Sequence, residues 1–334
     1  MNPATWPRLF DTGPIFANPV TAVVTATVAA LLLLTIPVIH LLARRGMIDG
    51  QLRDELLLRG RSWMVLAPLI LGPILLGTAW TIVAIGLLGL LCYREYAQAT
   101  GLFREKEVSL VVVLGILAVT FAALDHWYRL FVAVTPLTVG SIAIVAILRD
   151  QPRGYVQRVA LGVLGFVLFG SCLGHLGYLA NDPGYRPWMI LTFLAVELND
   201  IFAFVVGKTL GRRQLAPNTS PKKTVAGALG AVVLTTLLVV AVGGAAFRGT
   251  VLASPAHLVA LGLLVAVLGQ FGDLMLSSIK RDVGIKDMAA TIPGHGGLLD
   301  RFDSLILVAP VVFHYINYFV GVATSRPPHP LTGG

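Results

Sequence analysis

Acidic side chains recur beside apolar segments in the last third of the chain. Asp300 and Asp303 lie in IPGHGGLLDRFDS, three residues apart, so they share one face if this stretch opens a helix. Paired carboxylates suit Mg²⁺, which takes one or two of them together with the phosphate oxygens of a substrate. The alternative is that both carboxylates only offset the dipole of a helix N-terminus. The pair therefore predicts a Mg²⁺ site that a phosphate substrate completes.

A further acidic residue, Asp273, begins a polar column in GQFGDLMLSSIKR. Asp273, Ser277, Lys280 and Arg281 follow at spacings i, i+4, i+7 and i+8, which place a carboxylate, a hydroxyl and two cations on one helical face. Lys and Arg at a helix end also reach toward solvent without any binding role. That explanation is weaker for Asp273, because apolar residues flank it.

The sequence NTSPKKTVAG precedes another apolar segment and predicts the start of a helix. Ser220 is a suitable N-cap and Pro221 suits the first helical position. Lys222 and Lys223 would then lie on the first turn, where backbone N–H groups and the helix dipole favour phosphate. The alternative is a capped helix with lysines that only orient the chain in a membrane.

Glycine surrounds a single histidine in the segment before Asp300. Gly294, Gly296 and Gly297 flank His295, and glycine lets backbone N–H groups approach an anion closely. A tight loop without a ligand is the alternative.

Carboxylates also occur inside an apolar stretch, VELNDIFAFVVGK. Glu197 and Asp200 are three residues apart, and carboxylates within a membrane span are candidates for function. Lys208 offers a structural alternative, because it could neutralise one of them. For Glu95, next to Arg94, we expect local ion pairing.

Composition places these residues in a membrane protein. Of 334 residues, 56% are hydrophobic and 13% are charged, and mean hydropathy is +0.81, whereas soluble domains carry about 25% charged residues. Continuous apolar runs predict an all-α polytopic integral membrane helix bundle and argue against a β-barrel. The net charge of +8 does not indicate nucleic acid, because basic loops are usual in membrane proteins. Cys92 and Cys172 lie in apolar runs and predict neither a metal site nor a disulfide.

We expect nine or ten transmembrane helices, with ten candidate segments at about 18–43, 63–77, 79–93, 107–124, 130–148, 157–180, 188–207, 225–246, 256–276 and 304–322. One long helix over 63–93 is the alternative. Two helices there leave 20 of the 25 Lys and Arg residues in alternate loops on one side, which predicts that this side is cytoplasmic and that both termini lie outside.

The same pattern predicts the organisation of the chain. N-terminal membrane helices occupy 1–180, and a catalytic membrane region occupies 181–325 with cytoplasmic loops at 208–224 and 277–303. The apolar run from Pro19 to Leu42 is too long for a cleaved signal and predicts an anchor. The tail 326–334 predicts disorder.

The polar loop from Ser277 to Asp303 resembles the signature of the phosphatidate cytidylyltransferase (CDP-diacylglycerol synthase) family. The pattern is S-x-apolar-K-R, four residues, K-D, x, a small residue, two residues, apolar, P, x, H-G-G, apolar, x, D-R, apolar, D. The matching positions are Ser277, Ile279, Lys280, Arg281, Lys286, Asp287, Ala289, Ile292, Pro293, His295, Gly296, Gly297, Leu298, Asp300, Arg301, Phe302 and Asp303. Gly272–Asp273 and SPKKT at 220–224 also resemble family motifs, so the likeness covers roughly residues 190–310.

The resemblance implies an enzyme that condenses CTP with phosphatidate at the inner membrane and releases pyrophosphate and CDP-diacylglycerol. It implies Mg²⁺ at Asp273 and Asp300, with Asp303 nearby and a second cation open. Lys280, Arg281 and Lys286 would receive the lipid headgroup, and the remaining implied contacts would hold the nucleotide: Asp200, Ser220, Lys222, Lys223, Thr224, His295, Gly296 and Gly297.

Two departures concern the nucleotide pocket and the acceptor. Ala226 stands where the family usually has an acidic residue before Gly227, and NDIFAF at 199–204 replaces a more polar SDTGAY-like stretch. A divergent paralogue that acts on another lipid phosphate is therefore an alternative. An ion-coupled transporter using Glu197 and Asp200 is a further one, although two related halves are not apparent in the sequence. A homodimer is open.

Overall fold

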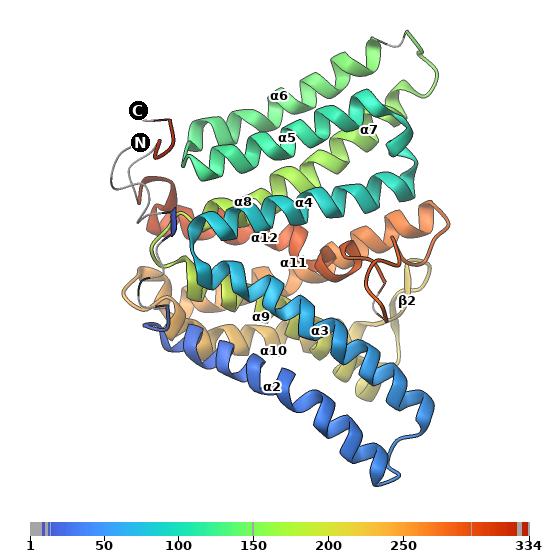
Figure 1. Ribbon diagram of the computed structural model, residues 1–334, viewed down its shortest axis with the longest axis vertical. Helices are drawn as coiled ribbons and strands as arrows, with labels where there is room; N and C mark the ends of the chain where they lie inside the picture. The colour runs from blue at the N-terminus through green and yellow to red at the C-terminus, as the bar shows by residue number, and fades with distance from the viewer. Residues whose placement is uncertain are drawn as a thin grey trace.

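The computed structural model describes residues 9–10, 13, 15–148, 150–294, 296–325 and 329–332, and most of them are helical (Figure 1). The helices and strands are α2 (Pro19–Arg44), α3 (Gly50–Leu76), α4 (Thr78–Thr100), η1 (Leu102–Arg104), α5 (Lys106–Leu124), α6 (Tyr128–Ile147), α7 (Tyr155–Gly165), η2 (Phe166–Cys172), α8 (Leu173–Leu179), α9 (Tyr185–Leu210), β1 (Gln214–Ala216), β2 (Ser220–Thr224), α10 (Val225–Ala246), η3 (Val251–Ala253), α11 (Pro255–Asp282), α12 (Leu299–Val320) and η4 (Val322–Thr324).

Within the described residues, nine helical segments are long and apolar enough to cross a membrane. α3 is not among them, because its first half carries Arg53, Asp54, Glu55, Arg59 and Arg61. Its apolar half spans only about 20 Å at 1.5 Å per residue, less than the roughly 30 Å hydrocarbon core. The predicted polytopic helix bundle is confirmed.

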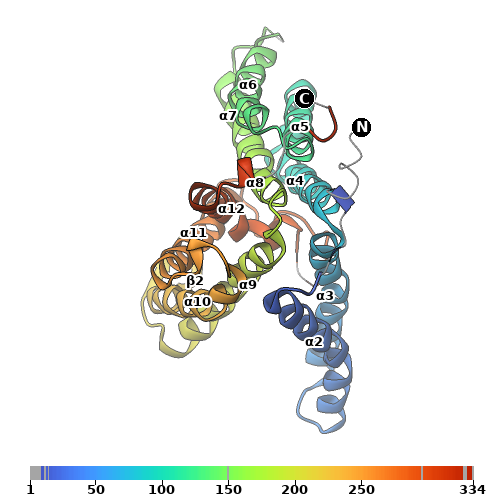
Figure 2. The same ribbon diagram turned by 90° about the vertical axis from the view of Figure 1, so that its left-hand side faces the viewer.

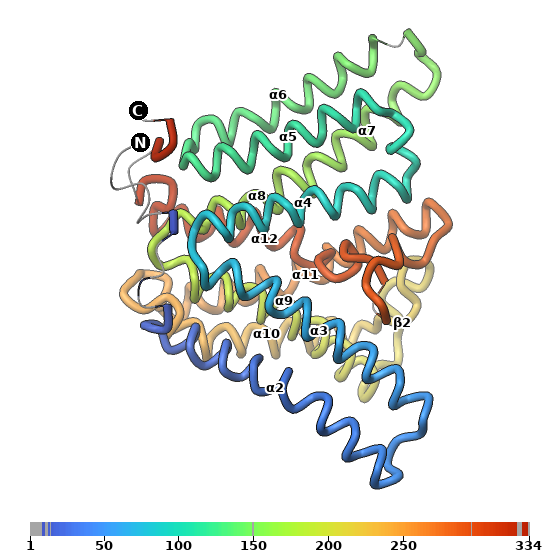
Figure 3. The backbone as a smooth tube through the Cα atoms, in the orientation of Figure 1, coloured from blue at the N-terminus to red at the C-terminus, as the bar shows by residue number. Residues whose placement is uncertain are grey.

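The break between α3 and α4 confirms the prediction of two helices over 63–93. Gly77 joins them with φ of 132°, a conformation that favours glycine. The Thr81 hydroxyl donates to the carbonyl of Pro73 at 2.9 Å, which satisfies an acceptor freed at the end of α3. Consecutive helices then reverse direction, so the hairpin of β1 and β2 lies at one end of the bundle and both termini at the other (Figures 1 and 3).

Three groups of helices diverge from a common centre (Figure 2). α9 to α12 form one group, α2 and α3 a second, and α5 to α7 a third. Helices on both sides of the predicted boundary at 180 share one core, since the ring of Phe313 on α12 lies 6.3 Å from Phe131 and 5.6 Å from Tyr178. The functional division at 180 stays a prediction.

Close backbone contacts hold the site-bearing helices together. A Cβ at Gly272 on α11 would lie 2.7 Å from the carbonyl oxygen of Asp303 on α12. A Cβ at Gly227 on α10 would lie 2.5 Å from the carbonyl oxygen of Ala203 on α9. Both contacts are closer than a side chain permits, so glycine sets the spacing of these helices.

Part of the tail predicted to be disordered contacts the helix bundle. Residues 326–328 and 333–334 of this tail lie outside the described residues. Between them, Leu331 N donates to Asp125 Oδ1 at 2.8 Å and Thr332 Oγ1 donates to Asp125 Oδ2 at 2.7 Å, and the disorder of the tail stays a prediction. Asp125 is fully buried and has a helix-end position after α5.

Candidate active site

A cavity of about 770 Å³ opens at the end of the bundle that carries β1 and β2. Helices α3, α9, α11 and α12 and strand β2 contribute to its walls. Nine of the predicted site residues line it: Asp200, Ser220, Lys222, Lys223, Thr224, Asp273, Lys280, Asp300 and Asp303. Segments separated by more than 100 residues thus converge on one polar chamber at the edge of the bilayer.

Asp273 lies on α11 with the predicted polar column. Ser277 Oγ donates to Asp273 Oδ1 at 3.1 Å, which confirms that these side chains share a helical face. Lys223 Nζ forms an ion pair with Asp273 Oδ2. The side chain of Asp273 keeps 22% of its surface exposed, so it is available to a ligand in the cavity.

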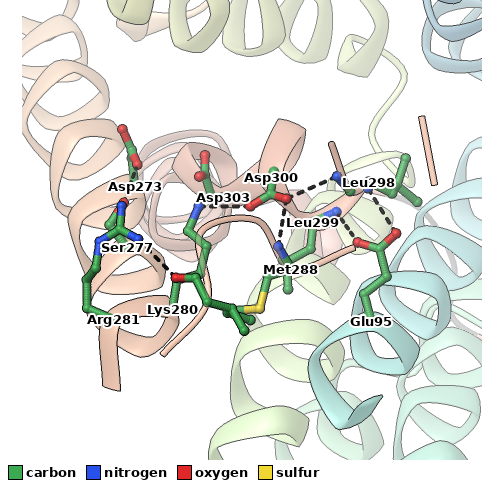
Figure 4. A network of polar contacts seen from close by, with 12 residues as sticks. Glu95, Asp273, Ser277, Lys280, Arg281, Met288, Leu298, Leu299, Asp300 and Asp303 are labelled. Atoms are coloured by element: carbon green, nitrogen blue, oxygen red, sulfur yellow. Dashed lines mark hydrogen bonds and ion pairs between the residues drawn. The ribbon is translucent and has the colours of Figure 1, made fainter. Parts of the chain in front are cut away.

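Asp300 opens α12, as predicted, and organises the loop before it (Figure 4). Lys280 Nζ donates to Asp300 Oδ1 at 2.8 Å. The backbone N–H groups of Met288 and Gly297 donate to Asp300 Oδ2 at 2.9 and 3.0 Å. Three of about four acceptor positions on this carboxylate are therefore occupied by the protein.

Asp303 lies one turn further along α12 and is 7% exposed. Its Oδ1 accepts from the backbone N–H of Ser304 at 2.7 Å, and Ser304 Oγ donates to Asp200 Oδ2 at 3.2 Å. Asp303 is also within electrostatic range of Asp273. Carboxylates from α9, α11 and α12 thus gather in one wall.

The segment 220–224 corrects the predicted helix start. Ser220–Thr224 forms β2, antiparallel to β1, and α10 begins only at Val225. The N-cap is Thr224, whose Oγ1 accepts from Gly227 N at 3.1 Å. Ser220 is not an N-cap, and Lys222 and Lys223 extend from a hairpin rather than from the first helical turn. Residues 220–224 form a strand because they pair with β1, in which Gln214 lies opposite Thr224.

Four other predicted residues within the described part of the chain, Arg281, Lys286, Gly296 and Gly297, do not line the cavity. Arg281 is exposed and donates to the carbonyl oxygens of Thr219 and Ile285, at 3.3 and 2.9 Å. It therefore ties the hairpin to the end of α11. Lys286 is exposed on the following loop, and His295 lies outside the described residues.

Gly296 and Gly297 have structural reasons to be glycine. Gly296 has φ of 85°, and its carbonyl accepts from Ile292 N at 2.8 Å in a tight turn. A Cβ at Gly297 would lie 2.6 Å from Glu95 Oε2 and 3.1 Å from Asp300 Oδ2. These contacts support the alternative that the glycines only allow a tight loop. The anion-binding role stays a prediction.

Sequence reasoning missed the role of Glu95. The expected pairing with Arg94 is not what holds this carboxylate: Glu95 is 5% exposed and accepts from Leu298 N at 3.0 Å and Leu299 N at 2.8 Å (Figure 4). Thr291 Oγ1 also donates to it. A carboxylate on α4 therefore holds the start of α12 across some 200 residues of sequence. Its position among apolar neighbours on a helix was the only available signal.

Other charges complete the chamber. Arg59 and Trp63 on α3 line it, although no motif indicated them. In all, six carboxylates and five cations face the cavity: Glu197, Asp200, Asp273, Asp287, Asp300 and Asp303, and Arg59, Lys222, Lys223, Lys280 and Arg301. A polyanionic nucleotide would add several negative charges, so a divalent cation is electrostatically appropriate.

The donor set fits Mg²⁺ completed by substrate. Among the described residues, no three His, Cys, Asp or Glu side chains gather closely enough to enclose a metal alone. Mg²⁺ does not require such a cage, because one or two carboxylates plus phosphate oxygens and water suffice. Asp273 and Asp303 present carboxylate oxygens to the cavity, and Asp303 Oδ2 accepts no hydrogen bond within the described part of the chain.

A membrane helix bundle with a polar, carboxylate-lined cavity is consistent with an enzyme that acts on phosphates. Comparison with known proteins identifies its family. The model of the cytidylyltransferase family matches residues 57–319, so the chain belongs to this family. The uncharacterized protein YnbB of Escherichia coli (strain K12) is 31% identical over 303 residues, covering 88% of this chain and 97% of YnbB.

Relatives named for an enzyme activity cover less of the chain. The phosphatidate cytidylyltransferase of Bacillus subtilis (strain 168) is 30% identical over 224 residues, covering 64% of this chain and 81% of that protein. The phosphatidate cytidylyltransferase of Rickettsia bellii (strain RML369-C) is 34% identical over 196 residues, covering 52% and 84%. The chain is therefore a membrane nucleotidyltransferase, and the predicted family membership is confirmed.

Proposed function

We propose that the protein transfers the cytidylyl group of CTP to phosphatidate and forms CDP-diacylglycerol and pyrophosphate at the cytoplasmic face of the inner membrane. One observation carries the proposal: a single cavity at the membrane edge joins the aspartates of α9, α11 and α12 to Lys222 and Lys223. The sidedness follows from the excess of Lys and Arg at this end of the bundle.

The reaction requires little proton transfer from the protein. An oxygen of the phosphatidate phosphate attacks the α-phosphorus of CTP, and the bond to the β-phosphate breaks to release pyrophosphate. The attacking monoester is already ionised near pH 7, because its second pKa is about 6. Positioning and charge neutralisation are therefore the main tasks of the site.

Residues of the hairpin and of α11 supply the positioning. Lys222 and Lys223 extend from β2 into the cavity and would contact the triphosphate. Lys223 forms an ion pair with Asp273, which would be exchanged in part for phosphate contacts when the nucleotide binds. Lys280 is 8% exposed and paired with Asp300, so it supports the loop as well as offering a positive field to the reacting phosphates.

A bound Mg²⁺ would supply positive charge that offsets the negative charge of the triphosphate and of the pyrophosphate that leaves. Asp273 and Asp300 are the predicted ligands. We add Asp303, because Asp300 already accepts three hydrogen bonds from the protein. A second cation and a homodimer stay predictions.

The test is turnover by the purified protein with phosphatidate, radiolabelled CTP and Mg²⁺. Labelled CDP-lipid is the expected product. Failure to form it, under conditions in which the Bacillus subtilis relative works, would reject the proposal.

One observation favours a different lipid phosphate as the acceptor. Ile201 and Phe204, within the stretch that departs from the family pattern, line the cavity. They replace polar surface by apolar surface beside the reaction site. A panel of lipid phosphates with CTP, including an isoprenoid phosphate and an ether-lipid phosphate, distinguishes a change of acceptor from a change of nucleotide.

A further inference from the structure

An apolar groove follows α3 and α4 outside the polar cavity. Its outer part has a volume of about 540 Å³ and its inner part about 360 Å³. Both parts are lined by Leu66, Leu69, Leu91 and Leu298, so they are continuous along these helices. α3 and α4 diverge from their junction toward the end that carries β2, and the loop before α12 lies between them there (Figure 1).

The groove is long enough to hold acyl chains of one lipid leaflet. It extends along α3 from Leu58 to Ile74, about 24 Å at 1.5 Å per residue. One leaflet of hydrocarbon is about 15 Å deep, half of the roughly 30 Å core. Leu69 and Trp80 on its walls are 64% and 51% exposed, as expected for surfaces that lipid covers.

Positive charge gathers only at one end of this groove. Arg61 on α3 and Arg94 on α4 line its outer part together with the hydroxyl-bearing Ser62. Both arginines are exposed, and neither forms an ion pair or hydrogen bond with another described residue. The one carboxylate in the lining, Glu95, is already engaged by the backbone of Leu298 and Leu299. The open end therefore suits an anionic headgroup.

One helix separates this groove from the catalytic cavity. Leu58, Arg61, Ser62 and Val65 face the groove at helical spacings of i, i+3, i+4 and i+7. Arg59 and Trp63, on the adjacent faces of the same turns, line the cavity instead.

The loop before α12 completes the partition. Ser62 Oγ donates to the carbonyl of Pro293 at 2.7 Å, which ties the loop to α3. Thr291, Ile292 and Pro293 line the groove, while Asp287 and Asp300 at the two ends of the loop line the cavity. A phosphate at Arg61 and Arg94 would thus lie across α3 from the cavity, so a lipid held there is docked beside the reaction site and must still bring its headgroup into the cavity before transfer.

We propose that the α3–α4 groove is the site where the acceptor lipid docks before transfer, with its acyl chains along Leu69 and Leu91 and its phosphate first held at Arg61 and Arg94. This proposal rests on the proposed function, because it assigns that reaction's lipid substrate to a site. It replaces Arg281 and Lys286 as headgroup contacts, since neither lines the groove or the cavity.

Lipid binding without turnover provides the first test. Native mass spectrometry of the purified protein, without CTP, would compare dioleoyl phosphatidate with dioleoylglycerol, which lacks the phosphate. We expect phosphatidate to be retained by the wild type and to bind about tenfold more weakly to the R61Q/R94Q variant, because two solvent-exposed ion pairs with the phosphate are lost and each contributes only modestly. The R104Q variant is the matched control, since Arg104 is exposed near the same end of α4 but does not line the groove.

Kinetics and crosslinking complete the test. R61Q/R94Q should raise the KM for phosphatidate about tenfold and leave the KM for CTP unchanged. Leu69→Trp should have the same effect by filling the groove, whereas Leu114→Trp, at an exposed position on α5, should not.

Three results would overturn the proposal. The first is equal phosphatidate binding by the wild type and R61Q/R94Q, and the second is arginine-dependent binding with an unchanged KM for the lipid. The third is a photoreactive phenylalanine at Leu69 that crosslinks to a second copy of the chain instead of to lipid. If phosphatidate binding depends on the arginines but no CDP-lipid forms in any assay, the proposed function fails separately and this site is no acceptor site.

Discussion

Replacing Asp300 by asparagine should destabilise the protein as well as inactivate it. Asp300 and Lys280 form an ion pair at 2.8 Å, and their side chains are only 5% and 10% exposed. Asparagine would leave the Lys280 ammonium nearly buried without its hydrogen-bonded counter-ion, with Asp303 as the remaining carboxylate nearby. Removing one partner of a buried pair costs about 3–5 kcal/mol. The same change weakens the acceptor for Met288 N and Gly297 N.

The asymmetry of the pair gives the prediction a sharper form. Lys280→Met leaves Asp300 with two backbone donors and should cost less than Asp300→Asn. The double variant should regain part of the loss, because it leaves no unpaired buried cation. Thermal unfolding in detergent measures all three, and Asp287→Asn is the control, since Asp287 lines the same cavity but is exposed. Equal unfolding temperatures for the wild type and Asp300→Asn would refute this reasoning.

Three other variants test separate parts of the structure. Asp273→Asn should abolish CDP-lipid formation while shifting the unfolding temperature little, because Asp273 is part-exposed and its replacement keeps an acceptor for Ser277; normal turnover would contradict its assignment as a metal ligand. Glu95→Gln should lower stability by about 1–3 kcal/mol and reduce turnover, because one backbone donor at the start of α12 loses its acceptor; unchanged stability in thermal unfolding would contradict the role of Glu95. Burial raises the pKa of the Asp125 carboxyl, but hydrogen bonds from Thr332 and Leu331 outweigh it and hold the pKa below its usual value. The stability from this group is therefore present above the ordinary aspartate pKa and lost as pH falls through the depressed one. The wild type should therefore lose more stability in acid than Asp125→Asn, which has no carboxylate to protonate at this position. The unfolding temperature measured against pH tests this, and the same dependence in both proteins would contradict it.

The helical membrane architecture could be predicted from local properties of the sequence. Apolar runs of membrane length require helices, because the bilayer offers backbone groups no other hydrogen-bond partners. The break at Gly77 could also be predicted from the sequence, because only two helices over 63–93 place most Lys and Arg residues in loops on one side. The spacing of Asp273 and Ser277 predicted their contact for the same reason: residues four apart on a helix are neighbours.

The segment 220–224 shows where local reasoning fails. Ser-Pro-Lys-Lys is a good helix start by capping rules, yet it pairs with β1 as a strand. A five-residue strand such as β2 has almost no periodic signal of its own, so its pairing with the three-residue β1 decided the conformation.

The sequence by itself determined the bundle of membrane helices and the residue types of the site, because hydropathy and helical spacing act over one or two turns. The tertiary structure decided which carboxylates share a wall, because α9, α11 and α12 are brought together only by packing at positions such as Gly272. It also decided the task of Glu95, whose partners lie about 200 residues away. Its carboxylate fixes the start of α12 because buried backbone N–H groups there require an acceptor, and no local pattern specifies which helix supplies it.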